Sequence, residues 1–206
     1  LIIEQELKNW KILIDETGTL NDYTSGYSEP PSAMITVIIP PDTTLPPAPF
    51  NYHSTTCAMD ETNRLQDILF KNQSIYILVL HYSTGAPAAD NITEEVLTID
   101  FHAQMWRYVL LLSLELNASV QAGKAVSRKT LVNMYMENVS QLKAGIDTLF
   151  HDFIAQLAEA NGNRPGWKSL KLTSPVIIGK DQHPYLGYPD ALGRLFRLAK
   201  STLSLI

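Results

Sequence analysis

The chain has 206 residues, of which 45% are hydrophobic and 18% are charged, and its formal net charge is −5. Ten glycines and one cysteine exclude a collagen-like chain and a disulfide scaffold, and the aliphatic content excludes a disordered tail, so a soluble globular protein is expected. The first 100 residues carry 4 Lys and Arg against 14 Asp and Glu, whereas the remaining residues carry 12 against 7. An acidic half therefore precedes a basic half.

The compartment is suggested by two features that point in opposite directions. Cys57 is the only cysteine and cannot close an internal disulfide, which favours a reducing compartment, such as a cytoplasmic assembly or a virion built there. Four N-glycosylation motifs would instead indicate secretion, but we interpret them as coincidental because two lie in apolar helical patterns. They begin at Asn72, Asn91, Asn117 and Asn138. The longest apolar stretch, residues 108–116, is far shorter than the ~20 residues of a bilayer span, so no membrane span is expected.

The N-terminal third predicts one helix, two strands and long connectors. Apolar residues recur at spacings of three and four over residues 1–15, which predicts an amphipathic helix. Residues 17–32 are rich in Gly, Ser, Tyr and Asp, so residues 1–32 are expected to form an arm and a connector. A single α+β domain is expected over residues 33–206. It begins with a β-branched run at 33–39, bounded by proline pairs, that predicts a buried strand.

The following residues complete the expected fold. Proline-dense residues lead to a helix over 60–71 and an apolar strand over 74–82. Two long helices, 91–122 and 127–160, are separated by a short break and are expected to form an antiparallel hairpin. A strand over 169–178 and a helix that begins at Pro189 close the chain. The predicted fold class is α+β and helix-rich, with the long antiparallel αα-hairpin packed on a small mixed β-sheet.

Histidines and acids of the long helices are the first candidates for chemistry. Asp100 and His102 on one helix could approach Asp147 and His151 on the other, but no third or fourth ligand can be placed. We interpret Asp147 and His151 as a solvated helical pair, and no metal or cofactor is expected.

The lone cysteine is the second candidate. Cys57 has His53 and Asp60 close in sequence, yet catalytic groups usually converge from distant segments. The sequence has no G-x-S-x-G, Walker or dinucleotide-binding glycine pattern. No catalytic residue is therefore assigned.

The sequence favours a non-enzymatic structural subunit of a larger assembly, such as a virion, a phage tail or connector, or another multisubunit machine. Its partners would be copies of itself and other subunits, because oppositely charged halves can pair head to tail. Nucleic acid is not expected, since the chain is acidic. The candidate interface residues are Trp10, Phe50, Tyr52, Tyr185, Tyr188, Arg194, Arg197 and Lys200.

Two other functions stay open at this point. The first is a secreted helical binding glycoprotein, which the glycosylation motifs would support. The second is a small hydrolase or metal enzyme that uses His102, His151 or His183.

Overall fold

A computed structural model describes residues 8–17, 33–41, 43–81, 105–109, 111–112, 115, 130–137, 146–163, 170–173 and 175–203. Its helices and strands are, in chain order, β1 (Lys8–Thr17), β2 (Ala33–Ile39), α2 (Met59–Lys71), β3 (Tyr76–His81), β4 (Thr130–Glu137), α4 (Ile146–Asn161), β5 (Leu170–Leu172), β6 (Val176–Ile178) and α5 (Gly187–Leu203). Residues 105–109, 111–112 and 115 are also helical.

The strands form one six-stranded mixed sheet with the order β3-β2-β1-β4-β5, and β6 also pairs with β4. β2 is antiparallel to both of its neighbours, β1 and β3, whereas β4 runs parallel to β1. β5 and β6 run parallel to β4, β5 beside its beginning and β6 beside its end. Since β1, β4 and β6 run in the same direction, their carboxyl ends point toward the same end of the sheet.

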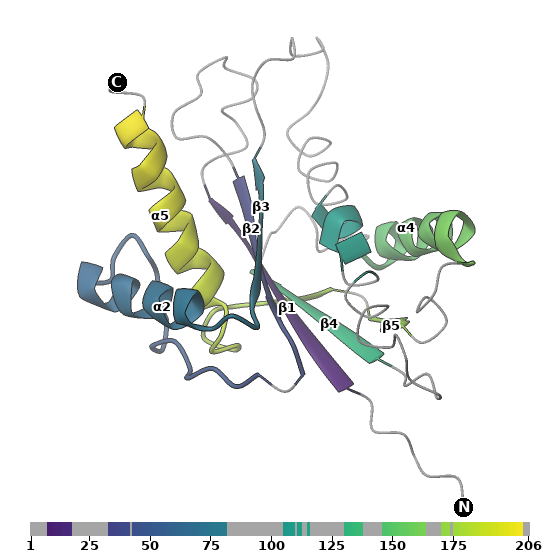
Figure 1. Ribbon diagram of the computed structural model, residues 1–206, viewed down its shortest axis with the longest axis horizontal. Coiled ribbons are helices and arrows are strands. Elements are labelled where there is room, and N and C mark those ends of the chain that lie inside the picture. The colour runs from purple at the N-terminus through teal and green to yellow at the C-terminus, as the bar shows by residue number, and fades with distance from the viewer. Residues whose placement is uncertain are drawn as a thin grey trace, which may run out of the picture.

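Helices cover both faces of this sheet (Figure 1). α2 and α5 pack on one face, which we call the α2/α5 face, through Leu65, Leu69 and Leu192. α4 and the helical residues around Trp106 pack on the opposite face, which we call the α4 face. There Trp106 and Phe150 meet edge to face, with ring centroids 6.0 Å apart. The sheet is thus the middle of three layers.

The helix predicted over residues 1–15 is wrong where the structure describes it, because Lys8–Thr17 forms β1. Leu13 points to the α2/α5 face, while Ile12 and Ile14 point to the α4 face, and all three are at most 1% exposed. Consecutive buried aliphatics suit a central strand that is covered on both faces. β1 lies between β2 and β4, and residues 1–7 lie outside the described part.

The predicted helix-rich architecture is also wrong, because the structure has a six-stranded sheet and no long αα-hairpin among its described residues, although its helices and mixed sheet are compatible with the α+β class. Within the helix expected over 127–160, Thr130–Glu137 forms β4, and α4 begins only at Ile146. Apolar residues four apart share a face in a strand as well as in a helix, because four is a multiple of the strand period of two. Leu131 and Tyr135 satisfy both patterns, and pairing with β1 selects the strand.

Other elements lie where the sequence predicts them. β2 has the predicted bounds, α2 begins one residue before the predicted helix and ends where predicted, and β3 is shorter than predicted by two residues at its start and one at its end. The strand expected over 169–178 is divided into β5 and β6, with Pro175 just before β6. Proline has no N–H to donate to a sheet, which explains the interruption. Thr173 stays attached to β4 through its N–H and its hydroxyl, which both donate to the Val132 carbonyl.

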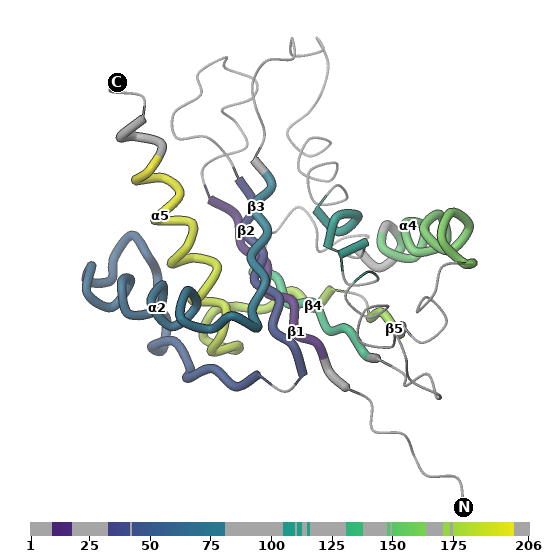
Figure 2. Tube along the Cα trace, viewed as in Figure 1, coloured from purple at the N-terminus to yellow at the C-terminus, as the bar shows by residue number. Residues whose placement is uncertain are grey.

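The last helix, α5, lies against strands from the first part of the chain (Figure 2). α5 packs on β1 and β2, and Gly193 on α5 lies so close to Thr17 that a Cβ there would meet the Thr17 side chain at 3.1 Å. The acidic and basic halves of the sequence are therefore in direct contact within one chain. No helix in the described part is long and apolar enough to cross a membrane.

Candidate functional site

Four charged side chains meet on the α2/α5 face of the sheet. The ammonium of Lys180 lies 2.7 Å from Asp190 Oδ2, 2.9 Å from Glu137 Oε2 and 3.4 Å from Asp15 Oδ2. We call these four residues the carboxylate–lysine centre. One cation faces three carboxyl groups, so the centre carries an excess of negative charge whenever all of them are ionised.

The directions of the strands bring these residues together. Asp15 lies near the carboxyl end of β1, Glu137 is the last residue of β4, and Lys180 follows β6 by two residues. These three strands are parallel and adjacent, and Asp190 reaches the same place from the first turn of α5. The carboxyl ends of parallel strands are the usual ligand-binding edge of open α/β sheets.

The centre is mostly shielded from water. The side chains of Asp15, Lys180 and Asp190 are 5%, 6% and 10% exposed, whereas Glu137 is 30% exposed and forms the open side. Burying charges costs free energy that the attraction between them only partly offsets, so such clusters are weak sources of stability. Buried ionisable groups with strongly shifted pKa values cluster at sites where proteins bind or transform a ligand.

Burial and neighbouring charges shift the pKa values of the centre. Burial alone would lower the pKa of Lys180, but the charges of Asp15 and Asp190 outweigh it and raise that pKa above its ordinary value. Burial also raises the pKa of Asp15 well above its ordinary value. The charge of Lys180 lowers this pKa, but it does not cancel the rise, because Glu137 raises the pKa further. Lys180 is therefore charged at neutral pH, while Asp15 retains its proton most readily.

Asp190 is the best-paired carboxylate of the centre. It accepts hydrogen bonds from the N–H and the hydroxyl of Ser54, at 3.0 and 2.5 Å. Burial alone would raise the pKa of Asp190, but Lys180 and Ser54 outweigh it and hold that pKa below its ordinary value. His53, whose side chain is 51% exposed, lies at the rim with Nδ1 4.0 Å from Asp190 Oδ2.

Two arginines of α5 fix this helix to the first half of the chain. Arg197 donates to the hydroxyls of Thr17 and Ser54, the latter at 3.1 Å. Arg194 donates to the carbonyl oxygens of Ser54 and Cys57. These guanidinium groups are used inside the chain, although the sequence places them among the candidate interface residues.

The loop that carries Lys180 is held against the sheet by aromatic contacts. His183 stacks on Tyr135 of β4 with ring centroids 4.2 Å apart. The Lys11 ammonium of β1 lies 5.0 Å from the centre of the Tyr185 ring. Burial, and then the charge of Lys11, lowers the pKa of His183, so this histidine is neutral at pH 7. These contacts keep Lys180 in place over the carboxyl groups.

The interface residues that the sequence predicts differ in how far they are exposed. Trp10, Tyr52 and Tyr188 are 7%, 1% and 0% exposed, so they fill the core of this chain and do not form its surface. Phe50 is 81% exposed. Lys200 lies in α5, and its side chain is outside the described part.

The other candidates from the sequence do not form a site in the described residues. His151 is exposed on α4, whereas Asp100 and His102 lie outside the described part, as does the Asp147 side chain. Cys57 and His53 are joined by a backbone hydrogen bond between the Cys57 N–H and the His53 carbonyl. No set of three His, Cys, Asp or Glu side chains in the described part is placed, as it stands, to hold a metal ion.

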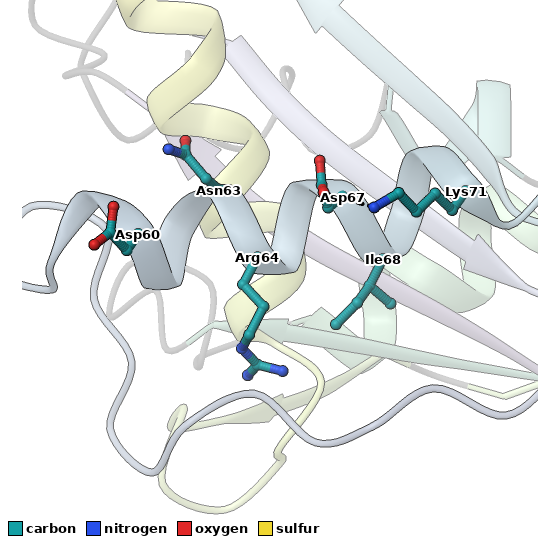
Figure 3. A pocket seen from close by; sticks show the side chains of 6 residues that line it. All are labelled: Asp60, Asn63, Arg64, Asp67, Ile68 and Lys71. Carbon is teal, nitrogen blue, oxygen red and sulfur yellow. Dashed lines mark hydrogen bonds and ion pairs between the residues drawn. The ribbon is translucent and has the colours of Figure 1, made fainter.

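A shallow hollow of about 440 Å³ lies along α2 (Figure 3). Its described lining residues all belong to this helix, and its two cations are already paired. Arg64 bonds Glu61, and Lys71 bonds Asp67 at 2.8 Å. The hollow shares no residue with the carboxylate–lysine centre, so it is a weaker candidate.

Sequence analysis does not single out Asp15, Glu137 or Lys180. The available signal is an acidic residue that directly follows an apolar run, as in Ile12–Leu13–Ile14–Asp15 and Met134–Tyr135–Met136–Glu137. That signal has meaning only when both segments are assigned to parallel strands, and the sequence pattern indicates helices for both.

Comparisons with known proteins do not assign a family. No protein-family model matches the chain, and no curated protein matches it.

Proposed function

We propose that this protein is a phosphate-ester hydrolase that works with a divalent cation at the carboxylate–lysine centre. The observation that carries the proposal is the convergence of three carboxyl groups and one lysine at the carboxyl ends of parallel strands. A hydrolase is one of the alternatives that the sequence leaves open, but the residues differ from those considered there.

The donor set indicates the kind of cation. The available ligands are carboxylate oxygens, which suit Mg²⁺ or Mn²⁺, whereas zinc sites are rich in histidine and cysteine. Magnesium is commonly bound by one or two carboxylates together with phosphate groups of the substrate. When bound, such a cation neutralises charge on phosphoryl oxygens and activates water.

The charges of the centre favour an additional cation. Lys180 alone faces three carboxyl groups, and the pKa of Asp15 is raised because burial and nearby acids disfavour its charged form. A divalent cation would supply the missing positive charge. It would have to replace some of the contacts of Lys180, and Glu137 offers the exposed side for its entry. Lys180 would then be available to stabilise negative charge on the substrate.

Hydrolysis assays test the proposal. We expect cleavage of bis(p-nitrophenyl) phosphate or p-nitrophenyl phosphate with Mg²⁺ or Mn²⁺, and loss to background in Asp190→Asn and Glu137→Gln. The matched control is Asp181→Asn, which removes an exposed carboxylate one residue from Lys180 and should retain activity.

Calorimetric titration with MnCl₂ gives a readout independent of the substrate. Wild-type protein should bind the ion, Asp190→Asn should bind it more weakly, and Asp181→Asn should match wild type. A wild-type protein that neither binds Mn²⁺ nor cleaves either ester would refute the proposal.

A structural subunit of an assembly, the function the sequence favours, is a second candidate. Phe50 supports it, since this side chain is 81% exposed at the end of a proline-rich segment. The segment is anchored through the Ala48 N–H, which bonds the Pro184 carbonyl, and through the Tyr188 hydroxyl, which bonds Pro46. A rigidly presented aromatic side chain is typical of an interface anchor. The test is the native mass of the complex from its source, which should be large and should fall in Phe50→Ser.

A further inference from the structure

Within the described part of the chain, the outer edge of β3 lacks the features that usually protect an edge strand. β3 is the last strand of the described sheet on its side and pairs only with β2 among the described strands. Its residues, Tyr76–His81, contain no proline, lysine or acidic side chain. Natural proteins usually place such residues on exposed edges, because unpaired N–H and C=O groups otherwise recruit another strand.

Apolar side chains extend to this edge. Ile77 and Val79 lie beside Val37 and Ile35 of β2 in the sheet register. The β2 residues are at most 1% exposed, whereas Ile77 and Val79 are 37% and 41% exposed. The apolar surface that α2 and α5 cover on β2 therefore continues onto β3, where it is partly exposed.

We propose that β3 pairs antiparallel with β3 of a second copy of this chain, joining the two sheets about a twofold axis. A strand that pairs with an identical strand in this way forms a closed, self-complementary interface. It would satisfy the outer backbone groups of β3 and cover Ile77 and Val79 of both copies.

The distribution of charge favours a second copy at this edge. The chain carries a net charge of −5, so two copies repel each other over most approaches. β3 has no acidic side chain, and at the adjacent end of α2 the Lys71 ammonium is paired with Asp67 at 2.8 Å. As far as the described residues are concerned, the edge is thus a place where two identical acidic chains can approach without bringing like charges together.

Light scattering after size-exclusion chromatography, over a series of protein concentrations, tests this proposal. Wild-type protein should reach twice the 23.0 kDa mass of one chain and no more. Val79→Lys and Ile77→Lys should be monomers, because each places a charge at the seam. Val176→Lys is the matched control, since Val176 is a 44% exposed valine on β6, and it should remain a dimer.

Hydrogen exchange of the wild-type protein provides a measurement that does not depend on how the variants fold. The β3 amides should become more protected as protein concentration rises, while those of β6 should not change. Wild-type protein that is monomeric at every concentration, or larger than a dimer, would overturn the proposal. So would a Val79→Lys variant that folds and remains dimeric.

Discussion

On the α4 face, the middle of β1 and β4 presents buried apolar side chains, whereas on the α2/α5 face the same strands carry the carboxyl groups of Asp15 and Glu137 near their carboxyl ends. Ile12 and Ile14 of β1 are buried beneath Trp106 and Phe150 on the first face. On the second face Leu13 is followed by Asp15, at the carboxyl end of the strand. The two faces share one backbone, so their difference is entirely one of side-chain choice at alternate positions.

The comparison separates stability from function. Apolar burial on the α4 face stabilises the fold at about 25 cal/mol per Å² removed from water. The charged centre on the α2/α5 face incurs a desolvation cost that its ion pairs only partly offset. Four substitutions test whether the two faces have these different roles.

Removing the cation of the centre should have the largest effect. Lys180→Met leaves three carboxyl groups without their ammonium partner, and breaking a buried ion pair in this way costs about 3–5 kcal/mol of unfolding free energy. Urea unfolding at neutral pH measures it. The control Lys171→Met changes an exposed lysine on β5 and should shift stability by less than about 0.5 kcal/mol. Equal effects of the two variants would contradict the importance of the centre.

A cavity on the opposite face should cost a similar amount without affecting the site. Phe150 is 2% exposed and packs on Trp106, so Phe150→Ala should destabilise the protein by about 3–5 kcal/mol. Urea unfolding gives the loss, and titration with MnCl₂ should match wild type at a temperature where the variant is folded. A changed ion affinity would show that the two faces are coupled.

A smaller loss is expected where α5 begins. A Cβ at Gly187 would lie 2.6 Å from the Ala48 Cβ and 3.1 Å from the Tyr52 ring. Gly187→Ala should therefore cost about 1–3 kcal/mol through overpacking, as thermal unfolding would show. If this variant is as stable as wild type, the loop that carries Ala48 must be able to move away from α5.

The smallest effect concerns the pH dependence of stability. The raised pKa of Asp15 means that the folded state holds this proton more tightly than the unfolded state does. Its stabilising contribution is therefore present in acid and is lost as the pH rises from the ordinary value of 3.8 through the raised pKa. Asp190, with a lowered pKa, acts in the opposite direction and loses its contribution as the pH falls.

Comparison of wild type with Asp15→Asn isolates the first of these contributions. The stability of wild type relative to the variant should decrease as the pH rises from 3.8 toward neutrality. Urea unfolding at several pH values measures the difference. A difference that grows with pH would mean that Asp15 is stabilised in its charged form.

Local signals in the sequence are reliable where the pattern fits a strand but not a helix, or a helix but not a strand. The β-branched residues 33–39 between proline pairs predict β2 with its observed bounds, and the apolar run before His81 predicts β3. Spacings of four do not distinguish a helix from a strand, which is why β4 is predicted as helix. When β4 is assigned as a helix, nothing in the sequence places Glu137 beside Asp15, so the candidate site is not predicted.

The sequence by itself determined the composition of a globular chain, the strand β2, the helices α2 and α5, and the turns set by proline and glycine. These depend on contacts and conformational preferences within a few residues. Only the tertiary structure decided that Lys8–Thr17 and Thr130–Glu137 are adjacent parallel strands, since that pairing joins residues more than 100 positions apart. It also decided that Asp15, Glu137 and Asp190 share Lys180, because long-range packing alone brings buried charges from distant segments together.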